Sequence, residues 1–202
     1  EQDEAAAMFD SMRTLNEAPI RLAEGLELHG CTDITGFGLI GHACEMAEGS
    51  GVQIELASGA VPLFDQVLDM ARLGIIPAGS YRNQDFFGPR VTADDDLEPG
   101  MLDALYDPQT SGGLLIAAPA ADVDELARRL HAEGRVAAVV GRKDFCIDDD
   151  VGRCIDGCFV EVCLRRSNGI ADVFIDAVDE GQAQRFRFRF DGHSVVLLSL
   201  VW

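Results

Sequence analysis

The sequence lacks an apolar run long enough to cross a membrane. A spanning helix needs roughly 18 or more consecutive apolar residues, and no segment of this 202-residue chain reaches that length. The first four residues, Glu1 to Glu4, are mostly acidic, whereas a signal peptide begins with basic residues. We therefore expect a cytoplasmic protein that has no membrane-spanning segment.

Basic residues are scarce as well. The chain has 16 Lys and Arg against 35 Asp and Glu, a net charge of −19, and Lys143 is its only lysine. A field this negative disfavours nucleic acid and anionic membranes as partners. It would also repel free ATP unless a divalent cation neutralised the phosphates. The apolar fraction of 48% is nevertheless that of an ordinary globular protein, so the acidity does not indicate disorder.

Cysteines gather in one part of the chain, but not in a pattern typical of zinc sites. Structural zinc sites usually contain two closely spaced Cys pairs, whereas here the spacing is C-x7-C-x3-C-x4-C. A buried or unrelated group of thiols is favoured over a metal site, which stays open as an alternative. The four residues are Cys146, Cys154, Cys158 and Cys163.

Apolar periodicity predicts a mixture of helices and strands before residue 142. Helical patterns occur within 4–28 (interrupted at Pro19), over 36–48, from Pro62 to Gly74 and over 122–133, and strand patterns occur at 26–29, 52–56, 114–118 and 136–140. The segments 77–83 and 83–100 are rich in turn-forming residues. Because the elements do not alternate strictly, we expect an α+β fold: a mixed sheet with helices packed on it.

The character of the chain changes after Gly141. Short strand-like runs follow one another at 159–164, 170–178, 185–190 and 194–201, with hairpin-turn signals at Asn168-Gly169 and Asp191-Gly192. We therefore predict two units, 1–142 and a small, mainly β extension at 145–202 whose role is unknown.

The segment from Cys31 to His42 carries the strongest functional signal. Asp33 is flanked by Thr32 and Thr35 and leads into Gly36 and Gly38, just before a helical pattern. On residue type alone, Asp33 is favoured as a helix N-cap. The glycines favour a second interpretation. Each weakens a helix by roughly 1 kcal/mol, a cost that is explained if another backbone segment or a ligand must come close to the backbone at that position. Asp33 would then be a metal ligand beside a phosphate.

A second segment, Asp107 to Leu115, contains Gly112-Gly113 before a buried strand. A tight turn is the simplest explanation. Its candidate binding residues, Thr110, Ser111 and Gly112, are placed to line the same site as Asp33 only if the fold joins the two segments.

Three other positions have chemistry that a site could use. His42 is favoured as a histidine satisfied by a neighbouring carbonyl rather than as a catalytic base. Cys31 has no His or Lys placed to activate it. Arg82 and Asn83 follow a glycine turn, and contact with a phosphate or partner domain is about as well supported as a solvated loop.

Taken together, these segments resemble the selenophosphate synthetase (selenide, water dikinase) family. Residues 31–42 resemble TDVTGFGLLGH, residues 107–115 reproduce DPQTSGGLL, and residues 77–83 resemble PGGTxRN with Ala78 and Ser80 in place of a Gly and a Thr. Several motifs in one order are far more specific than a single glycine-rich loop. The match covers about residues 8–142 and corresponds to the family's C-terminal domain, shared with aminoimidazole ribonucleotide synthetase.

The resemblance implies an α+β domain that packs against an N-terminal ATP-binding domain or subunit missing from this chain. It also implies a reaction of ATP, selenide and water, with Mg²⁺ or Mn²⁺, that yields selenophosphate, AMP and phosphate. Asp33 occupies the position of the family's metal-binding aspartate, whereas the reactive Cys or selenocysteine lies in the missing domain. The alternative is a diverged, non-catalytic module for regulation or assembly.

Overall fold

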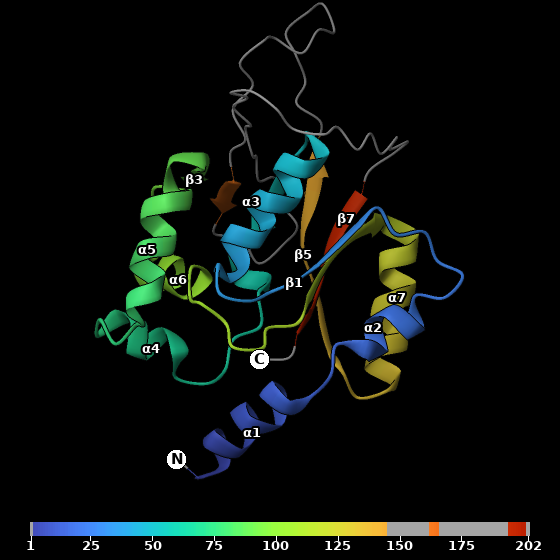
Figure 1. Ribbon diagram of the computed structural model, residues 1–202, viewed down its shortest axis with the longest axis horizontal. Helices are drawn as coiled ribbons and strands as arrows, with labels where there is room; N and C mark the ends of the chain where they lie inside the picture. Colours follow the sequence, from blue (N-terminus) through green and yellow to red (C-terminus); the bar gives the residue numbers. More distant parts are fainter. Residues whose placement is uncertain (1, 145–161, 166–193, 201–202) are drawn as a thin grey trace, which may run out of the picture.

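One seven-stranded mixed sheet forms the centre of the protein (Figure 1). The computed structural model describes residues 2–144, 162–165 and 194–200. The strand order is β1-β4-β7-β5-β2-β6-β3. The strands are β1 (Gly30–Asp33), β2 (Gln53–Ala57), β3 (Val91–Ala93), β4 (Leu114–Pro119), β5 (Val136–Asp144), β6 (Val162–Arg165) and β7 (Ser194–Leu200). Strand β6 pairs in parallel with both of its neighbours and the other pairs are antiparallel, which confirms the predicted mixed sheet.

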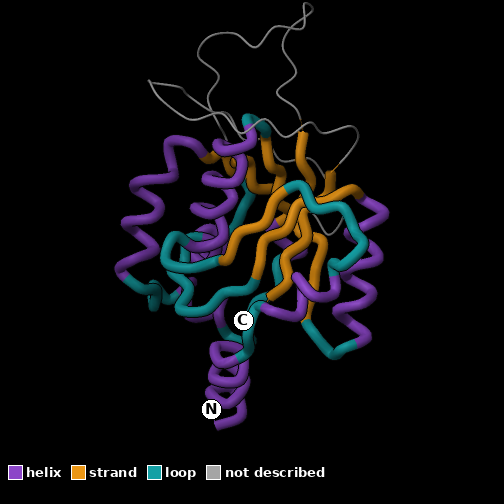
Figure 2. Tube along the Cα trace, turned by 45° about the vertical axis from the view of Figure 1, so that its right-hand side comes forward, coloured by secondary structure: helices purple, strands orange, loops and turns teal. Residues whose placement is uncertain are grey.

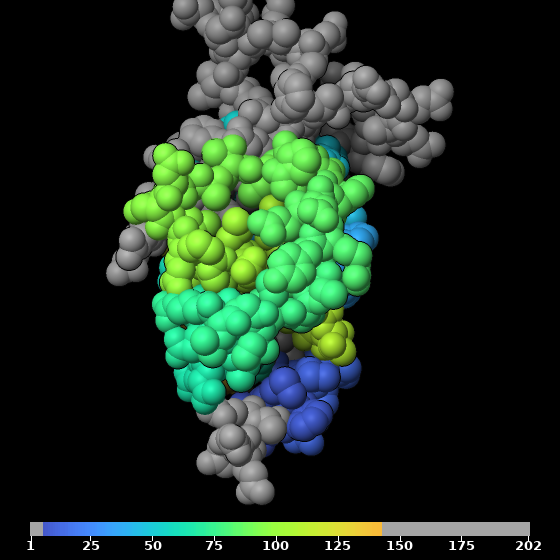
Figure 3. All heavy atoms as spheres, turned by 90° about the vertical axis from the view of Figure 1, so that its left-hand side faces the viewer, coloured from blue at the N-terminus to red at the C-terminus, as the bar shows by residue number. Residues whose placement is uncertain are grey.

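Helices cover both faces of the sheet, as the tube view shows (Figure 2). Helix α7 packs on β4, β5 and β7, and α2 packs against α7, whereas α3 packs on the opposite face and contacts β1, β2 and β4. The described α-helices are α1 (Gln2–Arg13), α2 (Glu17–Leu22), α3 (Gly38–Ser50), α4 (Val67–Arg72), α5 (Ala78–Phe87), α6 (Pro99–Leu105) and α7 (Ala120–Ala132). Helices α4, α5 and α6 form the outer surface seen in Figure 3.

Each face of the sheet has its own apolar core, and β4 contributes to both. Leu115 belongs to the cluster on the α3 side, while Leu114 and Ile116 belong to the cluster on the α7 side. Side chains alternate between the two faces of a strand, so a strand covered on both sides is apolar throughout. This explains the continuous apolar run that predicted β4. Every residue of β2 is also buried, and Ile54 and Leu56 belong to the cluster on the α3 side.

Three predicted elements are corrected by the structure. The strand expected at 26–29 lies at Gly30–Asp33, because β4 pairs with those residues; Leu26 and Leu28 instead pack beside the α7-side core. The turn expected at 77–83 is the start of α5, where Pro77 occupies the N-cap with extended φ and ψ and precedes the first helical residue. The helix expected from Pro62 begins only at Val67.

The two described strands beyond residue 145 join the main sheet. Strand β7 lies between β4 and β5 and pairs with both, and β6 lies between β2 and β3. They do not pair with each other, so these two strands differ from the separate antiparallel unit that we predicted. The runs 170–178 and 185–190, and the cysteines Cys146, Cys154 and Cys158, lie outside the described residues. The boundary near 142–145 stays a prediction.

None of the helices in the described ranges has the length and apolar composition that a membrane crossing requires.

Candidate active-site loops

Two loops that are far apart in the sequence are joined by backbone hydrogen bonds. The first, called here the Asp33 loop, comprises residues 33–38, and the second, the Asp107 loop, comprises residues 107–113. Ile34 N–H donates to Gly113 C=O (2.9 Å), and Gly112 N–H donates to Ile34 C=O (3.0 Å). Gln109 N–H donates to Thr35 C=O (3.0 Å). The fold therefore joins the two segments, through the pairing of β1 with β4.

Asn83, on a third element, links the Asp33 loop to the residue just before the Asp107 loop. Its side-chain Nδ2 donates to Gly36 C=O and to Tyr106 C=O, both at 2.9 Å, and the residue is buried within α5. The sequence left a phosphate contact, a partner contact and a solvated loop open for this residue. The structure instead gives it an internal role, and Arg82 lies exposed on the same helix. Asn16 contributes similarly from the N-terminal side, with Nδ2 donating to Gly112 C=O (3.3 Å).

Asp33 is not the N-cap of α3, so the interpretation favoured on residue type alone is wrong. It is the last residue of β1, and the N-cap position belongs to Phe37, which makes no side-chain capping hydrogen bond. The Asp33 side chain is exposed, and no described residue forms a hydrogen bond or ion pair with its carboxylate. Such an unpaired carboxylate is free to contact a cation.

The glycines of the two loops differ in whether the surrounding structure excludes a side chain at their positions. A Cβ on Gly38 would lie 2.8 Å from Tyr106 C and 2.9 Å from Asp107 O, and the residue has a φ of +71°. A Cβ on Gly112 would lie 2.7 Å from Ile34 O. Close packing between the loops therefore accounts for both glycines. Gly36 is different, because a Cβ there would meet nothing within 4 Å and the residue is exposed.

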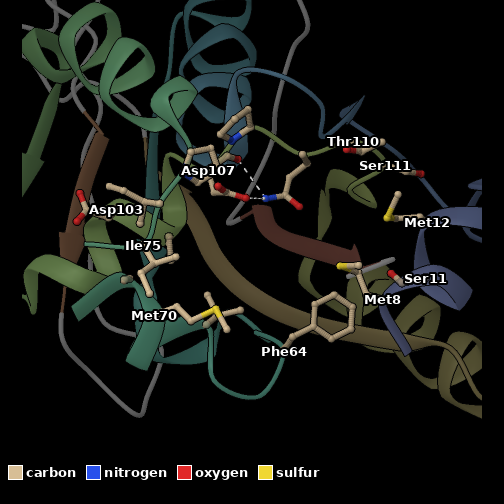
Figure 4. A pocket seen from close by; sticks show the side chains of 17 residues that line it. Met8, Ser11, Met12, Phe64, Met70, Ile75, Asp103, Asp107, Thr110 and Ser111 are labelled. Atoms are coloured by element: carbon tan, nitrogen blue, oxygen red, sulfur yellow. Dashed lines mark hydrogen bonds between the residues drawn. The ribbon is translucent and has the colours of Figure 1, made fainter. Parts of the chain in front are cut away.

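A cavity of about 410 Å³ opens beside the Asp107 loop (Figure 4). Thr110 and Ser111 line it, while most of its wall is apolar and comes from α1, α4 and the segments that adjoin α4. Figure 4 shows Met8 and Met12 on the α1 side and Met70 with Phe64 across from them. The other predicted binding residues, Thr32, Thr35, Gly36, Gly38 and Gly112, are not among its lining residues, and neither is Asp33.

Asp107 is the half-buried carboxyl group of this region. Burial raises its pKa, and the hydrogen bonds that it accepts from Gln109 Nε2 (2.8 Å) and Ser80 Oγ (3.4 Å) act in the opposite direction. Ser80 stands where the family pattern has Thr, so a hydroxyl group is retained there. Sequence reasoning did not single out Asp107, although its position at the start of the second motif was a usable signal.

His42 contacts a hydroxyl and a carboxylate rather than the expected carbonyl. Its Nε2 lies 3.0 Å from Thr35 Oγ1, and its Nδ1 lies 3.0 Å from Glu45 Oε2. Glu45 is three residues further along α3, on the same helix face. The imidazole is almost entirely buried, with the Phe37 ring 5.5 Å from it between centroids.

The structure gives Cys31 the properties of a weakly nucleophilic thiol. The residue is exposed at the edge of β1, and partial burial of the thiol together with the charge of Asp33 raises its pKa. Cys44 is buried in α3, and burial raises the pKa of its thiol to about 12. A raised pKa lowers the thiolate fraction, so neither thiol has the properties of an activated nucleophile.

The described residues could supply only part of a metal site. No three or more His, Cys, Asp and Glu side chains within 2–142 are grouped so that they could hold an ion. Asp33 is a single exposed carboxylate beside an open glycine, so it could supply one ligand but not a complete metal site.

The α+β architecture and the two joined loops are those of a domain class that the comparison with known families identifies. The chain belongs to the family "AIR synthase related protein, C-terminal domain", whose model matches residues 2–144. Within it, the chain is similar to proteins named selenide, water dikinase. The relative from Clostridium botulinum (strain Alaska E43) is 44% identical over 131 residues, or 65% of this chain and 38% of the relative.

Two further relatives carry the same name. The one from Trichlorobacter lovleyi is 51% identical over 117 residues, 58% of this chain and 33% of that protein, and the one from Clostridioides difficile is 40% identical over 140 residues, 69% and 40%. The predicted resemblance to the C-terminal domain of selenophosphate synthetase is thus confirmed. The chain spans about 38% of the length of the first relatives it matches.

Proposed function

We propose that this chain is the C-terminal part of a selenophosphate synthetase and that it presents the Asp33 loop to a metal–ATP complex. The overall reaction would consume ATP, selenide and water and release selenophosphate, AMP and phosphate. The proposal depends on one observation above all: an exposed carboxylate, unpaired among the described residues, lies on a loop whose backbone is open at Gly36. The remaining catalytic groups would come from an N-terminal ATP-binding domain or subunit, in keeping with the 38% coverage of the relatives.

In this proposal each loop residue has a limited task. Asp33 would hold Mg²⁺ or Mn²⁺, and the metal would neutralise phosphate charge during phosphoryl transfer. Gly36 would allow a phosphate to reach the backbone, because no side chain occupies the space above it. The polar groups of Thr32, Thr35, Thr110 and Ser111 would bind phosphate or metal, and the tightly packed Gly38 and Gly112 would fix the loop backbones. A cytoplasmic location follows from the proposed use of ATP.

A chimera tests this function directly. The chain would replace the matching 38% of the Clostridium botulinum relative, and ATP consumption with selenide would be measured while Mg²⁺ is varied. We expect Asp33→Asn to lower the rate at limiting Mg²⁺ by at least about a hundredfold, since even the loss of an outer-shell metal partner typically costs 10–100-fold.

The matched control is Asp124→Asn, which alters an equally exposed carboxylate on α7, across the sheet from the Asp33 loop. It should leave the rate unchanged. Equal rates for the two variants would rule out the metal role of Asp33. A folded chimera that consumes no ATP would instead favour the non-catalytic module for regulation or assembly.

A further inference from the structure

Glu45, His42 and Thr35 form a continuous chain of polar contacts that ends in the Asp33 loop. Glu45 Oε2 lies 3.0 Å from His42 Nδ1, and His42 Nε2 lies 3.0 Å from Thr35 Oγ1. Thr35 precedes α3, whereas the other two residues belong to it. The contacts therefore connect the exposed side of the helix with the loop that carries Asp33.

The chemistry of the three groups indicates which nitrogen of His42 carries the proton. An ionised carboxylate only accepts, so Glu45 requires a proton on His42 Nδ1. That nitrogen is buried and makes no aligned hydrogen bond with any described residue, so its 3.0 Å contact with Glu45 Oε2 is an electrostatic one. A proton on Nδ1 is attracted by the carboxylate, whereas a lone pair on Nδ1 would be repelled by it. With its proton on Nδ1, the neutral imidazole has a lone pair on Nε2, and the Thr35 hydroxyl must donate to it.

The packing keeps this arrangement in place. His42 is 7% exposed, and the Phe37 ring lies against its imidazole at a tilt of 39°. Gly41 permits that contact, since a Cβ there would lie 2.6 Å from Phe37 Cβ and 2.7 Å from Phe87 Cε2. The imidazole thus has little freedom to leave Thr35.

A hydroxyl that has already donated its proton can only accept from other groups. Thr35 Oγ1 would therefore present lone pairs to its surroundings, which suits a cation and not a phosphate oxygen. Thr35 is two residues from Asp33 on the same loop: Asp33 is exposed, Ile34 between them is fully buried and Thr35 is half-buried. Threonine hydroxyls are established Mg²⁺ ligands in phosphate-binding loops.

We propose that Glu45 and His42 are positioning residues that orient the Thr35 hydroxyl, so that its oxygen joins the Asp33 carboxylate as a ligand for a divalent cation. This inference deepens the proposed function and rests on its metal site. It separates Thr35 from the groups that would donate to phosphate and assigns tasks to His42 and Glu45.

The imidazole tautomer is the first test. Long-range ¹H–¹⁵N NMR spectra of the full chain would be recorded at pH about 8.5, above the ordinary imidazole pKa of about 6.5. His42 should show the Nδ1–H tautomer and should lose it in Glu45→Leu. His131 is an internal reference with the opposite tautomer, because its Nε2 lies 2.9 Å from Ala137 C=O. An Nε2–H tautomer at His42 in the unsubstituted chain would overturn the proposal.

Cation binding is the second test, with Mn²⁺ alone as the probe and paramagnetic broadening of the amide signals of residues 32–38 as the readout. Thr35→Val and Glu45→Leu should each weaken binding about tenfold, or about 1.4 kcal/mol. Thr35→Ser keeps the hydroxyl, and Glu45→Gln keeps an acceptor without the charge, so both should stay within about threefold of the unsubstituted chain. Thr92→Val, on the distant strand β3, should have no effect.

The Mn²⁺ titration also separates this proposal from the function on which it rests. Loss of binding in Asp33→Asn without any change in Thr35→Val and Glu45→Leu would refute the role of Thr35 and leave the proposed function intact. Unchanged binding in Asp33→Asn would contradict the metal site and with it both proposals, whereas no broadening in the unsubstituted chain would refute the two-ligand site of Asp33 and Thr35 proposed here. Amide spectra of each variant would verify that it is folded.

Discussion

Replacing Gly38 with alanine should destabilise the protein by about 2–5 kcal/mol, through two separable effects. The φ of +71° costs an L-residue roughly 1–2 kcal/mol. The new methyl group would also lie under 3.0 Å from backbone atoms of Tyr106 and Asp107, and forcing atoms into a packed region typically costs about 1–3 kcal/mol. Since single domains are stable by only about 5–15 kcal/mol, the loss should be easily measured.

Two other glycines provide matched controls for urea unfolding. Gly25 has a φ of +81° but open space around its Cβ position, so Gly25→Ala should show the conformational cost alone, about 1–2 kcal/mol. Gly36 has neither a positive φ nor a close neighbour, so Gly36→Ala should change stability by less than about 1 kcal/mol. If Gly38→Ala were no worse than Gly25→Ala, close packing between the two loops would not be the reason for this glycine.

Gly36→Ala also separates packing from ligand approach. In the active chimera, a methyl group at this position would stand where a phosphate is proposed to reach the backbone. We expect ATP consumption to fall at least about tenfold, equivalent to 1.4 kcal/mol of transition-state stabilisation, while the urea midpoint stays unchanged. Full activity in this variant would contradict the proposed approach of phosphate to Gly36.

Two further predictions concern groups with shifted pKa values. Burial raises the pKa of Asp107 above its value in the unfolded chain, so the folded state binds the proton more tightly and the free energy of unfolding falls as pH rises through the folded pKa. The Asp107→Asn variant should not show this fall. Urea unfolding midpoints that decline equally with pH in both proteins would contradict the prediction. Burial and the charge of Asp33 raise the pKa of the Cys31 thiol. Removing that charge by Asp33→Asn, or neutralising it with saturating Mg²⁺ in the unsubstituted chain, should therefore speed alkylation of Cys31 at neutral pH, measured by peptide mass spectrometry. A Mg²⁺ effect that persists in Asp33→Asn would argue against Mg²⁺ binding at that carboxylate.

The sequence predicted the elements whose patterns are local and missed those that depend on tertiary contacts. The apolar run of β4 and the periodicity of α7 were correctly interpreted, because double cover and one-sided burial each leave a clear pattern. The start of α5 was misread as a turn, since Pro77 and Gly79 are turn residues unless the following segment packs as a helix. A Cβ on Gly79 would lie 2.6 Å from Pro108 Cγ, a contact that only the fold reveals.

The candidate site shows the same division. The two glycine-containing motifs indicated two loops that the fold joins by backbone hydrogen bonds, and their resemblance to one family indicated that they work together. The sequence did not reveal that Asn83 contacts the Asp33 loop or that His42 faces Thr35, because side-chain partners in different elements leave no periodic signal. Nor could it distinguish the glycines that permit packing, Gly38 and Gly112, from Gly36, whose surroundings are empty.

The position of β7 has a consequence for how the molecule reaches its native state. Strands β4 and β5 are consecutive in the described part of the chain before residue 145, yet a gap the width of one strand separates them until residues 194–200 arrive. Pairings that close such long chain segments form slowly, because the entropy lost in loop closure precedes the energy gained. Before that step, two apolar strands have unpaired edges that invite association with other chains. Folding yield should therefore depend on how quickly this last segment is inserted.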